Sequence, residues 1–185
     1  MVKVPKNGIL EHDGFLQAPV RMLMTALCFL ECDPRLPSEP LQEYIEAIAA
    51  CRRESGHPGL EHDRLFLSSY VHDATHATCD SCSLAHVVLR PVRSSQHPRI
   101  HYGLIASGNQ VMKAASLRDK WGREREILRS EMEAAGIINT LSCLVIRGIC
   151  DYSDSHTRKD FQIYAAATVT SFAKLLLCYL NDCVG

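Results

Sequence analysis

The sequence lacks an excess of charge of either sign. Its 20 lysines and arginines nearly balance 21 aspartates and glutamates, giving a formal net charge of -1. Nucleic acids and anionic membrane surfaces attract clustered positive charge, so neither is predicted as a partner. The amino end also lacks the apolar run that a secretory signal requires. We therefore predict a cytoplasmic protein whose nine cysteines are mostly reduced thiols.

Several common catalytic motifs are missing as well. The chain has no Gly-x-Ser-x-Gly elbow, no Walker phosphate loop and no dinucleotide-binding fingerprint. No organic cofactor is therefore predicted. Internal repeats and low-complexity tracts are also missing, and 185 residues suffice for one domain with a sizeable core.

Residues 161–180 form the longest apolar stretch, with Lys174 as its single charge. Twenty apolar residues are about the length of a membrane span. However, Gln162, Thr168 and Ser171 interrupt the stretch, and its aromatic and aliphatic residues recur at spacings of three and four. We predict a buried terminal helix rather than a membrane span.

A Cys-x-x-Cys pair lies in the least regular part of the chain, residues 61–99. Two imidazoles and two thiolates could bind zinc there, from His72, His76, Cys79 and Cys82. A second Cys-x-x-Cys, which makes zinc ribbons convincing, is missing. The alternative is a flexible insertion with incidental histidines and cysteines, and zinc is not favoured.

The rest of the chain is more regular. Helices are predicted from about residue 18 to residue 32 and from 41 to 54, within a helical amino-terminal segment of residues 1–60. Residues 100–183 then alternate short apolar runs with helical segments. Strands are predicted at 100–106, 127–128 and 144–150, and helices at 114–126, after Glu133 and at 161–180. Such alternation predicts an α/β fold with a parallel sheet covered by helices, all in one domain.

Polar residues follow each of the three predicted strands. Ligands of parallel sheets bind beyond the carboxyl ends of the strands, so these residues should face one crevice. Glu131 and Glu133 flank Met132, and two carboxylates suit a ligand with neighbouring hydroxyls. Spacing alone favours a plainer interpretation, in which Glu131 is exposed and Glu133 fills the first turn of a helix.

Asp151 follows a run that is apolar except for Arg147. A carboxylate at the mouth of a buried strand is partly desolvated, which raises its pKa and suits an acid catalyst. The alternative is a turn residue before the next helix. Arg147 needs an anionic partner, for which Glu131 and Asp151 are the candidates.

Three motifs in this order resemble the nucleoside phosphorylase superfamily. Residues 100–111 read Ile-His-Tyr-Gly-Leu-Ile-Ala-Ser-Gly-Asn-Gln-Val and are similar to the family's base-binding strand and loop. Residues 131–136, Glu-Met-Glu-Ala-Ala-Gly, resemble its Glu-Met-Glu signature, and residues 147–151, Arg-Gly-Ile-Cys-Asp, its catalytic-acid strand. The chain looks most like fungal phosphorylase-like domains, which often accompany ankyrin, tetratricopeptide or NTPase modules.

The resemblance implies a three-layer α/β/α fold and cleavage of the N-glycosidic bond of a purine-type nucleoside, by water or with phosphate as co-substrate. It implies that Glu133 holds the ribose hydroxyls, with Glu131 beside it, and that Met132 packs under the sugar. Asp151 would protonate the leaving base. The base would lie against the turn that contains Ser107, Asn109, Val111 and Met112. Oxocarbenium character on the sugar and negative charge on the base make these residue types appropriate.

The family's amino-terminal half carries a Gly-rich phosphate loop, and nothing in residues 1–99 resembles it. Residues 128–130, Leu-Arg-Ser, also depart from the usually apolar strand before the Glu-Met-Glu signature. We therefore predict the carboxyl-terminal part of such a domain, without its amino-terminal strands, and self-association through the uncovered sheet edge, including homo-oligomers. The alternative is a non-catalytic nucleoside- or partner-binding module of a sensor-like fungal protein.

Overall fold

The computed structural model describes residues 2–3, 11–12, 18–34, 39–108, 111–138, 140–156 and 159–184. Its helices are α1 (Arg21–Cys32), α2 (Glu39–Cys51), α3 (Ala115–Arg125) and α4 (Gln162–Val184). The strands are β1 (Val2–Lys3), β2 (Glu11–His12), β3 (Leu104–Ser107) and β4 (Ile127–Glu131). Single 3-10 turns lie at Arg53–Ser55, Leu60–His62, Cys79–Ser81, Leu84–His86 and Ala134–Gly136.

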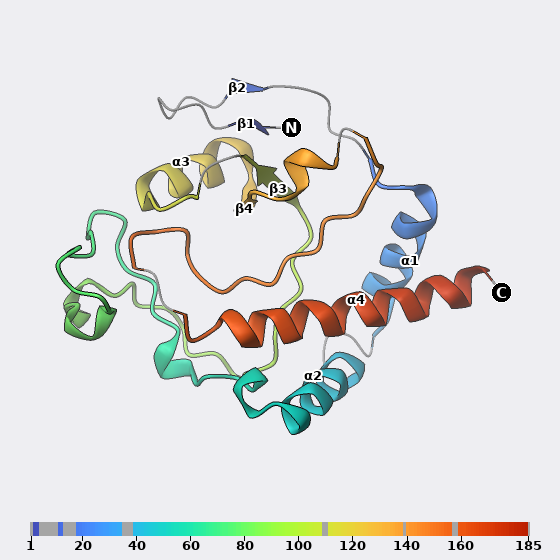
Figure 1. Cartoon of the computed structure of the whole chain (residues 1–185), viewed down its shortest axis with the longest axis horizontal. Coiled ribbons are helices and arrows are strands. Elements are labelled where there is room, and N and C mark those ends of the chain that lie inside the picture. Colours follow the sequence, from blue (N-terminus) through green and yellow to red (C-terminus); the bar gives the residue numbers. More distant parts are fainter. Residues whose placement is uncertain are drawn as a thin grey trace.

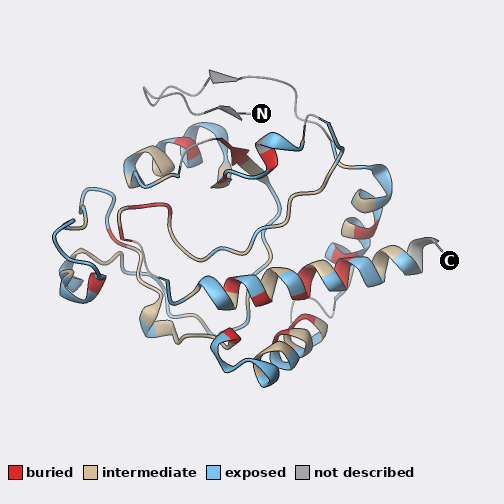
Figure 2. Cartoon of the chain, viewed as in Figure 1, coloured by how far each residue is buried: buried red, intermediate tan, exposed pale blue. Residues whose placement is uncertain are grey.

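The hydrophobic core lies where α1 and α2 pack against α4 (Figure 1). All three helices carry apolar residues at helical spacing, so each presents one apolar face to the others. Buried residues accordingly recur along α1, α2 and α4 (Figure 2). The buried members of this cluster are Ala26, Leu30, Leu41, Ile45, Phe172, Leu175 and Leu176. The predicted amino-terminal helices are thus confirmed, and they share their core with the carboxyl-terminal helix.

Leu30→Ala should lower the free energy of unfolding by about 2–5 kcal/mol, because it leaves a cavity in this core. Leu30 is fully buried, whereas its neighbour Phe29 is 58% exposed. Phe29→Ala is therefore the matched control, with an expected change of about 0.5 kcal/mol or less. Urea denaturation of the three proteins measures both effects. Equal losses for the two variants would contradict the position of the core.

Helix α4 is the terminal helix that the sequence predicts. By length and composition alone, Gln162–Asn181 could also cross a membrane, as could the core helix of many soluble proteins. Ala165, Phe172, Leu175 and Leu176 are buried, however, and the last three lie in the core with α1 and α2. The structure therefore agrees with the predicted buried helix.

Strands β3 and β4 form a parallel pair, and α3 connects them. The register places Ser107 opposite Glu131, so both strands end at the same edge. Trp121 of α3 is almost fully buried and anchors this helix. The chain thus has a mixed α/β fold that includes a small parallel sheet.

Two predicted elements are wrong. Residues 142–150 form neither a helix nor a strand, and the helix expected after Glu133 is only the turn Ala134–Gly136. Leu144 and Ile146 pack against the helical core, which gives the apolar run an alternative to strand pairing. The described parallel sheet therefore has two strands, and the mostly parallel three-layer arrangement is not seen in this part of the chain.

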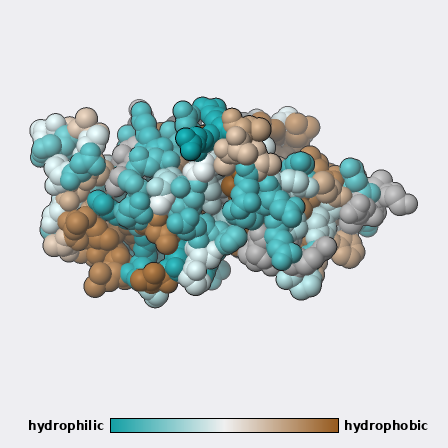
Figure 3. All heavy atoms as spheres, turned by 90° about the horizontal axis from the view of Figure 1, so that it is seen from below, coloured by the Kyte–Doolittle hydropathy of each residue, from teal (hydrophilic) through white to brown (hydrophobic). Residues whose placement is uncertain are grey.

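Residues 61–99 contain short 3-10 turns and one isolated bridge between Phe66 and Val87, which agrees with the predicted irregular segment. This segment exposes several large apolar side chains, namely Leu67, Val71, Leu84, Leu89 and Val92. Hydrophobic atoms gather at the left end of the molecule in Figure 3, the end at which this segment lies in Figure 1.

Candidate functional site

Two adjoining pockets lie beside β4 and at its carboxyl end. The first is lined on one side by α3 and β4 and on the other by residues 149–153. The second lies at the end of β4. The two pockets share Met112, Arg129, Ser130, Asp151 and Ser153. The second pocket therefore lies at the edge at which parallel sheets bind ligands.

Most of the predicted site residues line the second pocket. These are Val111, Met112, Glu131, Met132, Glu133 and Asp151, drawn from three separate parts of the sequence. Ser107 is buried opposite Glu131 in the sheet and is not among the lining residues. Asn109 lies outside the described residues.

Asp151 is held from two sides. Arg129 donates to its carboxylate oxygen Oδ1 at 3.1 Å and to its main-chain carbonyl at 2.6 Å. The Ser153 N–H also donates to Oδ1, at 2.9 Å. The second oxygen, Oδ2, receives only a long contact from the Cys150 thiol at 3.7 Å. Oδ2 is therefore the oxygen that a ligand could approach.

This environment corrects the expected setting of Asp151. The residue follows a segment that is not a strand, so the expected strand before it is wrong. Its side chain is 36% exposed and therefore still partly buried, as predicted. While it is ion-paired with Arg129, Asp151 accepts hydrogen bonds instead of donating a proton.

Arg129 is the functional candidate that the sequence predictions missed. It lies in β4, and its side chain is only 16% exposed. The sequence offered one signal for it: Arg129 stands in a strand that is usually apolar in the nucleoside phosphorylase superfamily, which this stretch resembles. A guanidinium that is largely withdrawn from water needs an anionic partner, and Asp151 supplies it.

Glu131 is buried, which contradicts the exposed position that spacing favours. Its Oε2 accepts hydrogen bonds from the N–H groups of Glu133 and Ala134 at 2.8 and 2.9 Å. The carboxylate therefore caps the turn Ala134–Gly136. Its other oxygen, Oε1, is buried and has no hydrogen-bond partner in the part of the chain that the structure describes. A buried acceptor of this kind is costly unless a donor fills it, so a ligand hydroxyl would be stabilised there.

Glu133 is more exposed than Glu131 and pairs with Arg147 at 2.9 Å. The sequence predicts Glu131 or Asp151 as the partner of Arg147. This prediction is wrong, because the partner is Glu133. The pKa of Glu133 is lowered chiefly because the Met132 N–H donates to its carboxylate, and Arg147 adds to the effect. Glu133 is therefore ionised at neutral pH and can accept hydrogen bonds.

The loop that carries Asp151 is fixed by contacts to residues 61–99. Tyr152 donates its hydroxyl hydrogen to Asp63 and accepts a hydrogen bond from Arg90 at 2.6 Å. Burial and the bond to Asp63 raise the pKa of Tyr152, so its hydroxyl remains protonated. The next residue, Ser153, has a φ of 52°, a left-handed conformation that is uncommon for residues other than glycine. Such strained residues often lie at binding sites.

The residues proposed for zinc come together only in part. The ligand atoms of His72, Cys79 and Cys82 lie within 4.8 Å of one another. The His76 ring is instead beside Asp73, at 3.6 Å, so its predicted place among the ligands is wrong.

Comparison with known proteins gives one similar chain. It is a "Nucleotide-binding leucine-rich repeat (NLR)-like protein" from Hyaloscypha variabilis, 38% identical over 188 residues. The match includes 95% of the present chain but spans only 18% of that protein. No family model matches the sequence. No solved structure matches it either.

Proposed function

We propose that the pocket at the ends of β3 and β4 binds a purine-type nucleoside and that the chain acts on its N-glycosidic bond. The proposal rests on one observation. The three motifs that resemble a nucleoside phosphorylase lie apart in the sequence, yet their residues line a single pocket. In this proposal α3, the parallel pair and α4 belong to a three-layer α/β/α domain of the phosphorylase type.

The charges in the pocket suit such a ligand. Oε1 of Glu131 lacks a donor, and the exposed Glu133 is ionised, so both carboxylates can accept hydrogen bonds from ribose hydroxyls. Met132 and Met112 supply apolar surface for the sugar and the base. Met112 also lines the first pocket, together with Trp121 and Ile149.

The reaction would break the bond between the base nitrogen and the sugar. The bonding electrons leave with the base, and water or phosphate adds to the sugar carbon that loses it. Asp151 is placed to bind the leaving base through Oδ2. In this role it would donate a proton or hold the base nitrogen by a hydrogen bond.

The test measures purine release from adenosine, inosine and methylthioadenosine, each with and without phosphate. Release only with phosphate identifies phosphorolysis, and release without phosphate identifies hydrolysis. Nucleoside binding is measured in parallel by calorimetry. A chain that neither binds nor cleaves any of the three nucleosides would contradict the proposal.

A second candidate is a non-catalytic nucleoside-binding module. Two observations favour it: Asp151 is ion-paired with Arg129, and the similar fungal protein is a much longer NLR-like protein. In this case the same calorimetry would detect a nucleoside, but no purine would be released under either condition. Release of purine would show that the chain is more than a binding module.

A further inference from the structure

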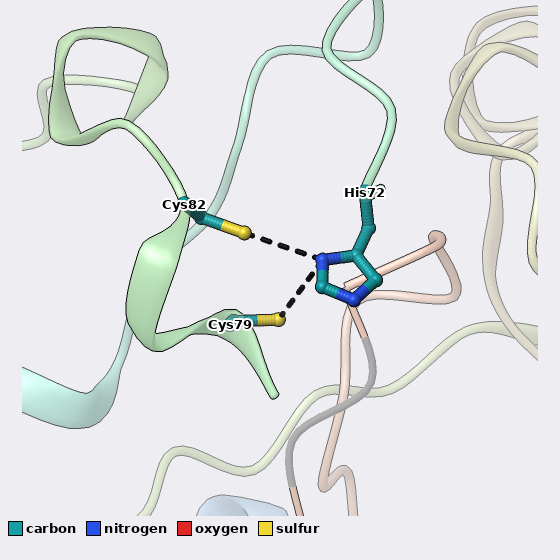
Figure 4. A group of neighbouring side chains, drawn as sticks. All are labelled: His72, Cys79 and Cys82. Carbon is teal, nitrogen blue, oxygen red and sulfur yellow. Dashed lines mark hydrogen bonds between the residues drawn. The ribbon is translucent and has the colours of Figure 1, made fainter. Parts of the chain in front are cut away.

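A cluster of metal-ligating side chains lies outside the candidate nucleoside pocket. Nδ1 of His72 is 3.3 Å from the sulfur of Cys82 and 3.9 Å from that of Cys79 (Figure 4). Both sulfurs therefore face the same ring nitrogen. In a tetrahedral zinc site, a sulfur and a nitrogen ligand are separated by about 3.5 Å, given zinc bonds of about 2.3 and 2.0 Å. The observed distances bracket this value.

The other nitrogen of His72 is already occupied. Its Nε2 lies 2.9 Å from the main-chain carbonyl of His76, where an N–H can donate. This bond places the hydrogen on Nε2 and leaves the lone pair of Nδ1 directed at the two sulfurs. Histidines that bind metals characteristically donate their second ring N–H to a carbonyl or a carboxylate. His76 thus contributes its backbone and not its ring.

The two cysteines are held together by local structure. The 3-10 turn Cys79–Ser81 places Cys82 close to Cys79, and the Cys82 N–H donates to the Cys79 carbonyl at 3.2 Å. Cys79 is buried and Cys82 is partly buried. Two thiolates would exactly balance the charge of a divalent cation, which suits a site withdrawn from water.

A buried histidine beside the cluster supplies an independent observation. His156 has only 2% of its side chain exposed, and its Nδ1 lies 3.7 Å from a carboxylate oxygen of Asp154. Among the described residues, its Nε2 has no hydrogen-bond partner. The centre of its ring is 5.7 Å from that of His72 and 4.1 Å from that of Phe66, on which it stacks. Buried polar groups are nearly always hydrogen-bonded or coordinated, so the unpartnered Nε2 points to a missing ligand.

We propose that His72, Cys79 and Cys82 bind a zinc ion and that His156 completes its tetrahedral coordination after a small shift of its ring. Two thiolates and two imidazoles are a ligand set characteristic of structural zinc. A hydrogen bond already connects the same two parts of the chain, because the His72 N–H donates to the Ser155 hydroxyl at 2.9 Å. The ion would fasten residues 72–82 to the loop that carries Asp151.

The decisive measurement is the zinc content of the full chain, purified from cells supplied with zinc. One zinc per chain is expected. Replacement by cobalt(II) should give a thiolate-to-cobalt charge-transfer band and the visible absorption of a tetrahedral site. Both readouts use the unmodified protein, so they do not depend on whether any variant folds. Protein without zinc, or with a Cys79–Cys82 disulfide in its place, would overturn the proposal.

Variants then identify the ligands. Cys82→Ser should abolish the cobalt charge-transfer band or greatly reduce it, and His156→Ala should raise the Kd for zinc at least ~10-fold. His76→Ala and Cys143→Ser are matched controls, because the first retains its backbone carbonyl and the second lies elsewhere in the chain. Both controls should bind zinc like the unmodified protein. Loss of zinc from His76→Ala, or an unchanged Kd in His156→Ala, would overturn the ligand set.

Discussion

Asp151→Asn should reduce kcat/KM for purine release by about 10²- to 10⁴-fold, the range expected when a general acid is removed. The substitution preserves the shape of the side chain and leaves an oxygen for the Ser153 N–H. It removes the acidic group of a residue that lines the pocket, whose Oδ2 has only the long contact with the Cys150 thiol among the described residues. It also removes the ion pair with Arg129. Rates of purine release from the preferred nucleoside measure the effect.

Asp160→Asn is the control for this experiment. Asp160 is a partly exposed carboxylate near His62 and is not among the residues that line either pocket. Its substitution should leave the rate unchanged. Nucleoside binding by Asp151→Asn should weaken much less than its rate falls, because in the proposed complex Glu131 and Glu133 would still hold the sugar. Purine release at the original rate by Asp151→Asn would exclude the proposed acid.

Gly148→Ala should destabilise the fold by about 3 kcal/mol, near the upper end of what overpacking of a closely packed site costs. A β-carbon on this residue would lie 2.8 Å from the carbonyl carbon of Ala165 and closer still to its oxygen. Both atoms belong to the backbone of α4, which cannot move aside as a side chain can. The melting temperature should therefore fall by several degrees, measured by circular dichroism.

Gly136→Ala is the matched glycine control. A β-carbon there meets no atom within 4 Å, and the residue lies in an exposed turn. Its melting temperature should remain close to that of the unmodified protein. If Gly148→Ala melted at the same temperature as Gly136→Ala, the close packing of residues 142–150 on α4 would be wrong.

The proposed zinc site and the proposed nucleoside pocket meet in residues 151–156. Asp151 lines the pocket, whereas Ser155 and His156 contact the segment that carries the two cysteines. Metal binding would therefore limit the motion of the loop that positions Asp151. The two proposals nevertheless remain separable, because zinc content is measured without any nucleoside.

The order of residue types determined the helices and the parallel pair. Apolar residues at helical spacing predicted α1, α2 and α4, and the run before Ser107 predicted β3, although the strand begins only at Leu104. These patterns depend on which face of one element is apolar, which is a local property. The convergence of the first two motifs followed from the same local reasoning, because neighbouring parallel strands end at one edge. Asp151 reaches the pocket from a segment that is not a strand.

Tertiary structure decided whether residues 142–150 became a strand. An apolar run can be buried against a sheet or against helices, and its composition is the same in both cases. Here Leu144 and Ile146 pack on the helical core. A strand also needs a neighbour with free backbone groups, and that depends on residues far away in the sequence.

Tertiary structure also decided the charge partners and which histidines lie near the two cysteines. Arg147 pairs with Glu133, and Arg129 pairs with Asp151. His156 lies beside His72, whereas the ring of His76 lies beside Asp73. Spacing along the chain shows which groups can be neighbours within one turn or strand. Ion pairs and coordination need atoms within a few ångströms, and only the folded arrangement of distant segments sets those distances.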